Sequence, residues 1–297
     1  MERKRVFKFG AILLVFLTIV SFTYNEEFVE FGNDNYYGWE FNTITLNREA
    51  SNKRIKVKYF AARDYNGASV PERFAKWFQS KNVIAFSSAG YMTEWDLNNA
   101  TPVGITVDNG RVVNRKVADF DALVVIYATG GVVVADINEG IKVKGIDKLL
   151  KVKNQRDRLQ FLDWCKKNSA TVFQTHLLAY KNKIRVANNA STTKSERRFL
   201  AVGKNDDNEL QYVIINSPKE TSLLDGSKKT LEYLHAMYDM NVTYMINLDT
   251  GGQNVFRGYL PNGEIYSTIN NKGEKVYPFL GSVSYKESVN LLVFYWQ

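Results

Sequence analysis

The sequence predicts one mixed α/β (α+β) domain, because short strand-like segments alternate with three helical segments and no linker divides them. The strand-like segments are rich in β-branched and aromatic residues with a period of two, whereas the helical segments repeat their apolar residues every three or four positions. Residues 25–297 contain no Pro/Ser-rich stretch, and their length is near the upper limit for a single hydrophobic core. Cys165 is the single cysteine, which excludes an internal disulfide.

Three segments are predicted to be helices. Ser69–Glu72 is a capping box with a proline in the first turn, and an apolar helical face follows as far as Phe78. Residues 155–167 and 228–239 repeat their apolar side chains at helical spacing. Leu159, Leu162 and Cys165 recur on one face of the first of these two segments. That pattern favours a buried thiol over a reactive one.

The strand predictions rest on apolar runs and on alternation. The segments concerned are residues 55–59, 83–86, 105–107, 112–113, 122–127, 132–137, 171–173, 199–202, 212–215 and 242–248. Asp108-Asn109-Gly110 predicts a hairpin turn between two of them. Residues 25–52 are expected to form a first strand or a tether, and short β segments end the chain. We expect the core of the domain to span residues 54–280.

The amino-terminal segment predicts export. Residues 1–8 carry four basic side chains against one acid, and an apolar run extends from Phe9 to Phe22. A basic flank keeps the amino end in the cytoplasm, and the run is shorter than the roughly 20 residues of a full membrane span. No clean small-x-small cleavage site follows it. Residues 1–24 are therefore expected to be a signal peptide or a membrane anchor, with the domain outside the cytoplasm; a buried helix is the alternative.

The charge of the chain is mild once the leader is set aside. Removing the four basic residues and one acid of residues 1–8 from the formal net charge of +8 leaves +5. This balance suits an anionic ligand or a cell-surface polymer. No dense Lys/Arg stripe with interleaved aromatic residues is present, so nucleic acid is not expected as a partner. The membrane is a partner only through the leader, if it stays uncleaved.

Four polar or glycine-rich loops adjoin predicted strands, where a rigid sheet can present side chains to a ligand. They are Ser87–Met92, Phe173–His176, Ser195–Arg198 and Asn247–Asn254. Each loop also has an ordinary structural explanation. Asp249-Thr250-Gly251-Gly252 can be a tight turn, His176 a core histidine, and the arginine pair a solvated strand edge.

In their order along the chain, these loops resemble the motifs of the phosphodiester glycosidase family over about residues 80–280. The stretches that carry the resemblance are Ser88–Met92, Pro102–Gly104, Asn109-Gly110, Asp121-Ala122, Phe173–His176, Arg197–Gly203 and Leu248–Asn254. The chain departs from the family pattern at several loop positions. Ser88 replaces Asn, Met92 replaces Phe, His176-Leu177 replaces Gly-Pro, Thr250 replaces Gly, and Gln253-Asn254 replaces Gly-Ser.

The resemblance implies an exported hydrolase that cleaves a sugar-1-phosphodiester or a related glycosidic bond in a cell-surface or extracellular glycan. Asp249 would be the base or would stabilise the oxocarbenium-like centre, and His176 would supply a proton or a hydrogen bond. Arg197 or Arg198 would bind the phosphate; neighbours in one strand point to opposite faces, so one of them is expected to be structural. The other expected substrate-binding residues are Ser88, Gly90, Tyr91, Thr175, Gly251, Gly252, Gln253 and Asn254.

Two alternatives stay open at this point. The first is an exported carbohydrate- or polymer-binding protein on the same fold that lacks catalysis, which the substitutions at Ser88, His176 and Thr250 favour. The second is another hydrolase, such as a phosphodiesterase. A metal-dependent enzyme is not indicated, because the chain has no HExxH, DxDxDG or paired-histidine motif. We expect no cofactor and no metal, and a glycan or sugar-phosphate substrate.

Overall fold

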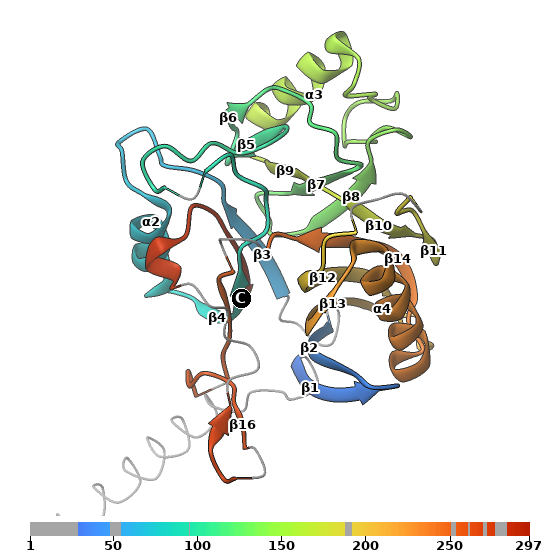
Figure 1. Cartoon of the computed structure of the whole chain (residues 1–297). Helices are drawn as coiled ribbons and strands as arrows, with labels where there is room; N and C mark the ends of the chain where they lie inside the picture. Colours follow the sequence, from blue (N-terminus) through green and yellow to red (C-terminus); the bar gives the residue numbers. More distant parts are fainter. Residues whose placement is uncertain are drawn as a thin grey trace, which may run out of the picture.

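The computed structural model describes residues 29–47, 55–94, 96–187, 192–250, 254–260, 262–269, 272–276 and 284–297. The expected leader, residues 1–24, lies outside these ranges. No helix within them is long and apolar enough to cross a membrane. The strand pairs between them are antiparallel, and together with the helices they make a mixed α+β domain, which confirms the predicted fold class (Figure 1).

The largest sheet has seven strands. Their order is β1 (Val29–Tyr36), β2 (Trp39–Asn47), β13 (Leu210–Thr221), β12 (Ser195–Lys204), β14 (Asn241–Leu248), β10 (Leu177–Tyr180) and β11 (Lys183–Ile184). Residues 29–47 form a hairpin that the sequence describes only as a strand or a tether. Its Phe41, Ile44 and Leu46 are fully buried. The core therefore extends beyond residues 54–280.

Two smaller sheets and a short hairpin complete the β structure. The four-stranded sheet has the order β15 (Phe256–Gly258), β4 (Asn82–Ser87), β18 (Leu291–Trp296) and β3 (Ile55–Phe60). The five-stranded sheet has the order β6 (Arg111–Asn114), β5 (Thr106–Asp108), β9 (Thr171–Thr175), β7 (Ala122–Ile126) and β8 (Val132–Asp136). The hairpin pairs β16 (Thr268–Ile269) with β17 (Lys275–Val276). Asn109 and Gly110 have φ angles of 50° and 81°, which is the geometry of the predicted turn between β5 and β6.

Within the described residues, three α-helices cover the sheets (Figure 1), and the short helix η2 (Tyr285–Glu287) follows near the carboxyl end. Helix α2 (Val70–Phe78) begins with the predicted capping box between Ser69 and Glu72. Helix α3 (Gln155–Lys167) buries Cys165, and burial raises the pKa of this thiol to about 12; Leu159, expected on the same face, is 51% exposed. Helix α4 (Leu223–Tyr238) begins five residues earlier than predicted, because Ser222 caps it.

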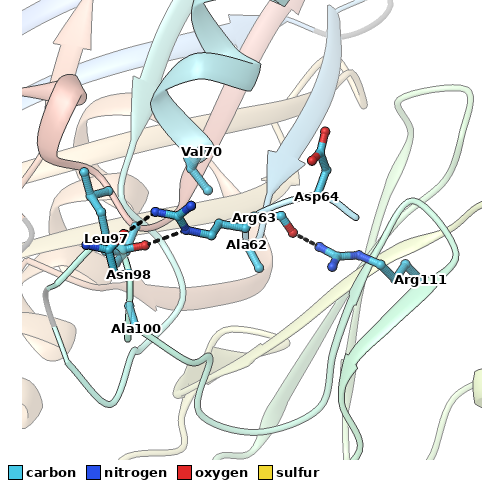
Figure 2. Close-up of a pocket in the computed structure, with 9 residues that line it drawn as sticks. Ala62, Arg63, Asp64, Val70, Leu97, Asn98, Ala100 and Arg111 are labelled. Carbon is cyan, nitrogen blue, oxygen red and sulfur yellow. Dashed lines mark hydrogen bonds between the residues drawn. The ribbon is translucent and has the colours of Figure 1, made fainter. Parts of the chain in front are cut away.

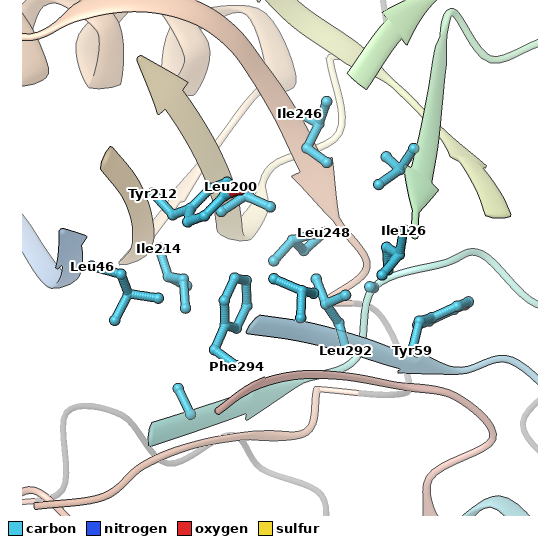
Figure 3. Packing of buried hydrophobic residues seen from close by; sticks show 14 of the residues in the cluster. Leu46, Tyr59, Ile126, Leu200, Tyr212, Ile214, Ile246, Leu248, Leu292 and Phe294 are labelled. Atoms are coloured by element: carbon cyan, nitrogen blue, oxygen red, sulfur yellow. The ribbon is translucent and has the colours of Figure 1, made fainter. Parts of the chain in front are cut away.

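The central core lies where the three larger sheets face one another (Figure 3). Leu46, Leu200 and Ile214 come from the seven-stranded sheet, Phe294 from the four-stranded sheet, and Ile126 from the five-stranded sheet. Full burial of an aliphatic or aromatic side chain contributes about 1.5–3 kcal/mol. The opposite face of the seven-stranded sheet packs on α4. Each sheet is thus fixed against the others by apolar contact, and their ends meet in one region.

Helix α2 is joined to β5 by a buried ion pair. Asp108 accepts hydrogen bonds from Arg73 Nη1 at 2.6 Å and Arg73 Nη2 at 3.0 Å, and from the Ala61 N–H at 3.1 Å. The side chain of Asp108 is 3% exposed. Because the charge is out of contact with water, removing one partner leaves the other unpaired in a medium of low polarity.

We expect Asp108→Asn to lower the free energy of unfolding by about 3–5 kcal/mol, because it leaves Arg73 without its buried counter-charge. Urea unfolding of the full chain measures this loss. Glu232→Gln is the matched control: it removes the exposed pair with Lys229 and should cost less than about 1 kcal/mol. Equal, small losses in both variants would show that the Arg73–Asp108 pair does not stabilise the fold.

Candidate functional site

Asp249 is the first residue after β14, and the loop that follows β4 holds both of its backbone groups. The Asp249 N–H donates to the Ala89 carbonyl at 3.0 Å, and the Asp249 carbonyl accepts from Ser88 Oγ at 2.6 Å. Ser88 is fully buried, and Asp249 is 7% exposed. Ser88 therefore positions Asp249 through its backbone, so the carboxylate projects from a fixed point.

Gly90 allows this loop to lie directly against β3. A Cβ at Gly90 would meet Tyr59 Oη at 2.4 Å. Asn290 binds the loop with its amide: Oδ1 accepts from the Ala89 N–H at 2.9 Å and the Gly90 N–H at 3.2 Å, and Nδ2 donates to the Gly90 carbonyl at 2.9 Å. Gly90 is thus a close-packing residue that directs the chain into Tyr91.

Arg198 lies inside the protein, not in the site. It is 1% exposed, and its guanidinium lies 4.1 Å from the centre of the Phe256 ring. Burial lowers the pKa of Arg198 to about 9, so the side chain is still charged at neutral pH. Oxygens of the protein replace water around this charge, at 2.8–3.3 Å: Ser87 Oγ, the Val255 carbonyl, Asn216 Oδ1 and Asn254 Oδ1.

Arg197 points to the opposite face of β12, toward α4, as strand alternation requires. It is half-buried, and it donates from Nε to the Thr221 carbonyl at 3.2 Å and from Nη2 to the Thr193 carbonyl at 2.8 Å. Its Cγ lies beside Gly226 of α4, where a Cβ would be 3.7 Å away, in ordinary van der Waals contact. These two bonds orient a guanidinium that has five N–H donors in total.

The stretch Gln174–His176 joins the five-stranded sheet to the other parts of the site. Gln174 is fully buried, and its Oε1 accepts from the Ile105 N–H at 2.7 Å and the Ala118 N–H at 3.1 Å. Gly104 permits this contact, because a Cβ there would lie 2.7 Å from Gln174 Oε1. Gln174 therefore fixes the loop before β7.

Thr175 and His176 attach β9 to the end of β14. Thr175 Oγ1 donates to the Asn247 carbonyl at 2.6 Å, and the Asn247 N–H donates to the His176 carbonyl at 3.1 Å. Thr175 is fully buried, so its hydroxyl has a structural role. The imidazole of His176, which is half-buried, is held next to Asn247 by these backbone bonds.

Aromatic rings form one wall of the site. The Tyr91 and Phe120 rings stack with centroids 4.8 Å apart, and the His176 ring meets both edge-on, at 4.8 Å from Phe120 and 5.6 Å from Tyr91. Asn247 Nδ2 donates to Tyr91 Oη at 2.6 Å, which fixes the phenol. Asn247 Oδ1 is buried and has no hydrogen-bond partner in the described part of the chain.

The charges of the site act on Tyr91 and His176. Burial and then the Asp249 carboxylate raise the pKa of Tyr91 to about 12, so the phenol keeps its proton, while Arg197 acts in the opposite direction. Burial lowers the pKa of His176 below its usual value, and Arg197 lowers it further against the effect of Asp121. The imidazole is therefore neutral at pH 7.

The remaining predicted residues lie after Asp249. Asn254 is 7% exposed, and its amide is engaged at both ends: Oδ1 accepts from Arg198 and Nδ2 donates to Glu196 Oε2 at 3.1 Å. Thr250 Oγ1 donates to the Glu196 carbonyl at 2.8 Å. Gly251, Gly252 and Gln253 lie outside the described residues.

The structure thus brings together Asp249, Tyr91, His176 and Arg197, from four separate segments. Ser88, Gly90, Thr175, Arg198 and Asn254 lie behind them and hold the segments in place. Sequence reasoning did not select three further residues of this region, Phe120, Asp121 and Asn247. Asp121 stands in a motif that carries the family resemblance, and Asn247 immediately precedes the Leu248–Asn254 loop motif, so both positions carried a usable signal. Phe120 carried none.

A separate hollow of about 170 Å³ opens beside Arg63 (Figure 2). Its lining includes Arg63, Asn98 and Arg111 but none of the predicted site residues. Arg63 donates to the Leu97 and Gly67 carbonyls and to Asn98 Oδ1, so its guanidinium is engaged in holding the neighbouring loop. Within the described ranges, no group of three or more His, Cys, Asp and Glu side chains is placed to hold a metal ion.

In sequence, the chain matches no protein-family model and no curated protein. Among solved structures it is similar to the catalytic domain of zebrafish N-acetylglucosamine-1-phosphodiester alpha-N-acetylglucosaminidase, auto-inhibited by its pro-peptide (TM-score 0.45, 14% identity, 90% of this chain and 81% of that one). It is also similar to a hypothetical protein from Synechocystis, with a TM-score of 0.45 and 9% identity over 91% of this chain and 62% of that one. A third similar structure is a Burkholderia pseudomallei protein described as exported, with a TM-score of 0.40 and 11% identity over 86% of this chain and 74% of that one. These are similarities of overall architecture and assign no activity.

The two neighbouring arginines should differ in their effect on stability. We expect Arg198→Gln to lower the free energy of unfolding by about 3 kcal/mol or more, because it leaves four oxygens without their buried cation. Arg197→Gln, the matched control on the accessible face, should cost less than about 1 kcal/mol. Denaturant unfolding of both variants measures the difference. A small loss for Arg198→Gln would contradict its structural role.

Proposed function

We propose that the protein hydrolyses the bond between a sugar and the phosphate of a sugar-1-phosphodiester. The observation that carries this proposal is the arrangement around Tyr91: its ring stacks on Phe120, its phenol is bonded by Asn247, and the charges of Asp249 and Arg197 both act on it. His176 contacts the same ring. A carboxylate, a guanidinium and an imidazole around one aromatic wall are the groups that such a reaction uses. The ordered motifs that resemble phosphodiester glycosidases support the same conclusion.

Arg197 is the residue we assign to the phosphate. Its two bonds to backbone carbonyls orient the guanidinium, and its other N–H groups can bind two phosphate oxygens in parallel. Arg198 cannot take this role, because it is fully enclosed by its own oxygen partners. Arg197 is accessible and Arg198 is structural because neighbouring side chains of one strand point to opposite faces.

The aromatic wall and Asn247 are suited to the sugar. Stacked Tyr91 and Phe120 present an apolar surface, on which the C–H face of a sugar ring can pack. Asn247 Nδ2 donates to Tyr91 Oη at 2.6 Å and so fixes the polar edge of this surface. A binding site needs this combination of apolar area and a few fixed polar groups.

Asp249 is the residue we assign to the water that attacks the anomeric carbon. The water oxygen forms a bond to that carbon, its proton passes to the carboxylate, and the carbon–oxygen bond to phosphate breaks. The electron pair leaves with the phosphomonoester, whose charge Arg197 stabilises. A phosphate leaving group needs less protonation than an alkoxide, so one ionised carboxylate near the anomeric carbon suffices, with His176 available for a hydrogen bond or a proton.

An exported location belongs to the same proposal. The basic, apolar segment at residues 1–24 supports a domain outside the cytoplasm, acting on a cell-surface or extracellular glycan and tethered to the membrane if the segment stays uncleaved. A protein that binds such a glycan without cleaving it is the second candidate. The substitutions at Ser88, His176 and Thr250 favour it, and the experiments below distinguish the two.

We expect Asp249→Asn to reduce turnover by about 10²–10⁴-fold, because asparagine keeps the hydrogen bonds of a turn but cannot accept the proton. The substrates are the methyl phosphodiesters of glucose, galactose and N-acetylglucosamine at carbon 1, with release of the sugar as the readout. Asp206→Asn, in an exposed turn, is the matched control and should leave turnover unchanged. If Asp249→Asn turns over at the wild-type rate, the catalytic assignment is wrong. Wild-type binding without turnover supports the second candidate.

Binding of these phosphodiesters should strengthen as the pH falls below 6.5. The pKa of His176 lies below its usual value, so the imidazole gains its proton only in acid, and the new positive charge then adds to Arg197. The single charge of a phosphodiester does not change over this range, so the effect reports the protein. Calorimetry between pH 5 and 8 measures it. His176→Gln should flatten the profile and His235→Gln should not; a pH-independent wild type would contradict the placement of His176.

A further inference from the structure

We propose that Asp121 sets the charge of His176: its carboxylate lies near the imidazole and stabilises the charged form of the ring when an anion binds. This inference rests on the proposed function for its role in catalysis. It adds a second carboxylate to the site.

The pairing of β7 with β9 places Asp121 beside His176. Ala122 lies directly opposite Thr175 at the end of this antiparallel ladder, so Asp121 and His176 are the next residues of the two chains beyond it. The Phe120 ring, next to Asp121 in the chain, lies 4.8 Å from the imidazole.

The loop that carries Asp121 is fixed from within. Gln174 accepts a hydrogen bond from the Ala118 N–H at 3.1 Å, and its Nε2 contacts the Phe120 carbonyl at 3.3 Å. The Asp121 carbonyl accepts from the Ile137 N–H at 2.8 Å. The backbone on both sides of the carboxylate is therefore held by the sheet, so its direction relative to His176 is not left to a flexible loop.

Asp121 has no structural partner in the described part of the chain. Its carboxylate makes no hydrogen bond or ion pair there, whereas the buried carboxylates Asp108 and Asp136 are each paired with an arginine. The imidazole of His176 likewise makes no hydrogen bond within these residues. Two complementary groups, both half-buried and neither hydrogen-bonded in these residues, thus lie near one another at the end of the β7–β9 ladder.

The charges around His176 give this pair its function. Asp121 and Asp119 favour the imidazolium from the loop before β7, Arg197 opposes it from β12, and the neutral Tyr91 phenol faces it from the loop after β4. Burial prevails, so the free site holds a neutral imidazole. A bound phosphodiester offsets the charge of Arg197, and the imidazole can then take up a proton that Asp121 stabilises.

This pair completes the proposed reaction. As the bond between the anomeric carbon and the phosphate oxygen breaks, the imidazolium can donate its proton to that oxygen. The water proton goes to Asp249, and exchange with solvent restores both groups. Asp121 touches neither the sugar nor the phosphate in this scheme; it acts through the charge of His176.

The experiment is a pH titration of the histidine ring protons by NMR, with the full chain in the absence of substrate. The chain has two histidines, so two sets of signals are expected, and His176→Gln assigns them. His235, whose Nε2 lies 3.1 Å from Asn182 Oδ1, is the internal reference. We expect Asp121→Asn to lower the pKa of His176, because it removes the negative charge opposite the ring, and to leave that of His235 unchanged.

Two further variants keep the test decisive. Asp119→Asn, on the same loop but exposed, is the matched control and should shift the pKa of His176 less. Asp121→Glu retains the charge and should restore much of the wild-type value. An unchanged His176 pKa in Asp121→Asn, or an equal shift in Asp119→Asn, would overturn the proposal. The titration needs no turnover, so the role of Asp121 can be disproved while the proposed activity holds. The proposed activity can likewise fail while the role of Asp121 holds.

Discussion

The burial of Arg198 is the constraint on which the rest of this structure depends. A guanidinium at 1% exposure must exchange its water for protein oxygens, and those oxygens come from β4, β13 and the segment before β15. The seven-stranded and four-stranded sheets therefore have to meet at one place and in one register. The cost of desolvating this charge is offset only when all of these partners are present, which makes the junction specific as well as stable.

The site follows from that junction. The sheets meet where β12 begins and β14 ends. Arg197 and Asp249 are each one residue from the buried Arg198–Leu248 pair of this junction, so they lie at the same end of the sheet. The loop after β4 then binds Asp249 through its backbone, and Thr175 ties the five-stranded sheet to Asn247. Most of the loop residues that resemble family motifs therefore hold the chain segments of the site in place. Of the others, His176 contacts the aromatic wall directly, and Asp249 and Arg197 act on it through their charges.

Local signals in the sequence were enough to predict the fold class, the capping box of α2, the Asn109-Gly110 turn and the strand before Asp249, because each depends on residues close in the chain. The hairpin of β1 and β2 was underestimated, since its burial comes from partners far along the chain, and the start of α4 was missed because Gly226 and Ser227 are weak helix formers. The sequence could predict that Arg197 and Arg198 face opposite ways. Which of them is buried depends on Ser87, Asn216 and Asn254, and only the three-dimensional structure brings these together.

The central claim is that a sugar phosphate binds at the end of β14, against Arg197 and the Tyr91–Phe120 wall. A crystal structure of the full chain with the methyl phosphodiester of N-acetylglucosamine, in the Asp249→Asn variant to prevent turnover, tests it most directly. The account predicts phosphate oxygens in hydrogen-bond contact with the Arg197 guanidinium, and the anomeric carbon facing residue 249. A ligand seated instead in the hollow beside Arg63 and Arg111, with Arg197 unengaged, would contradict it.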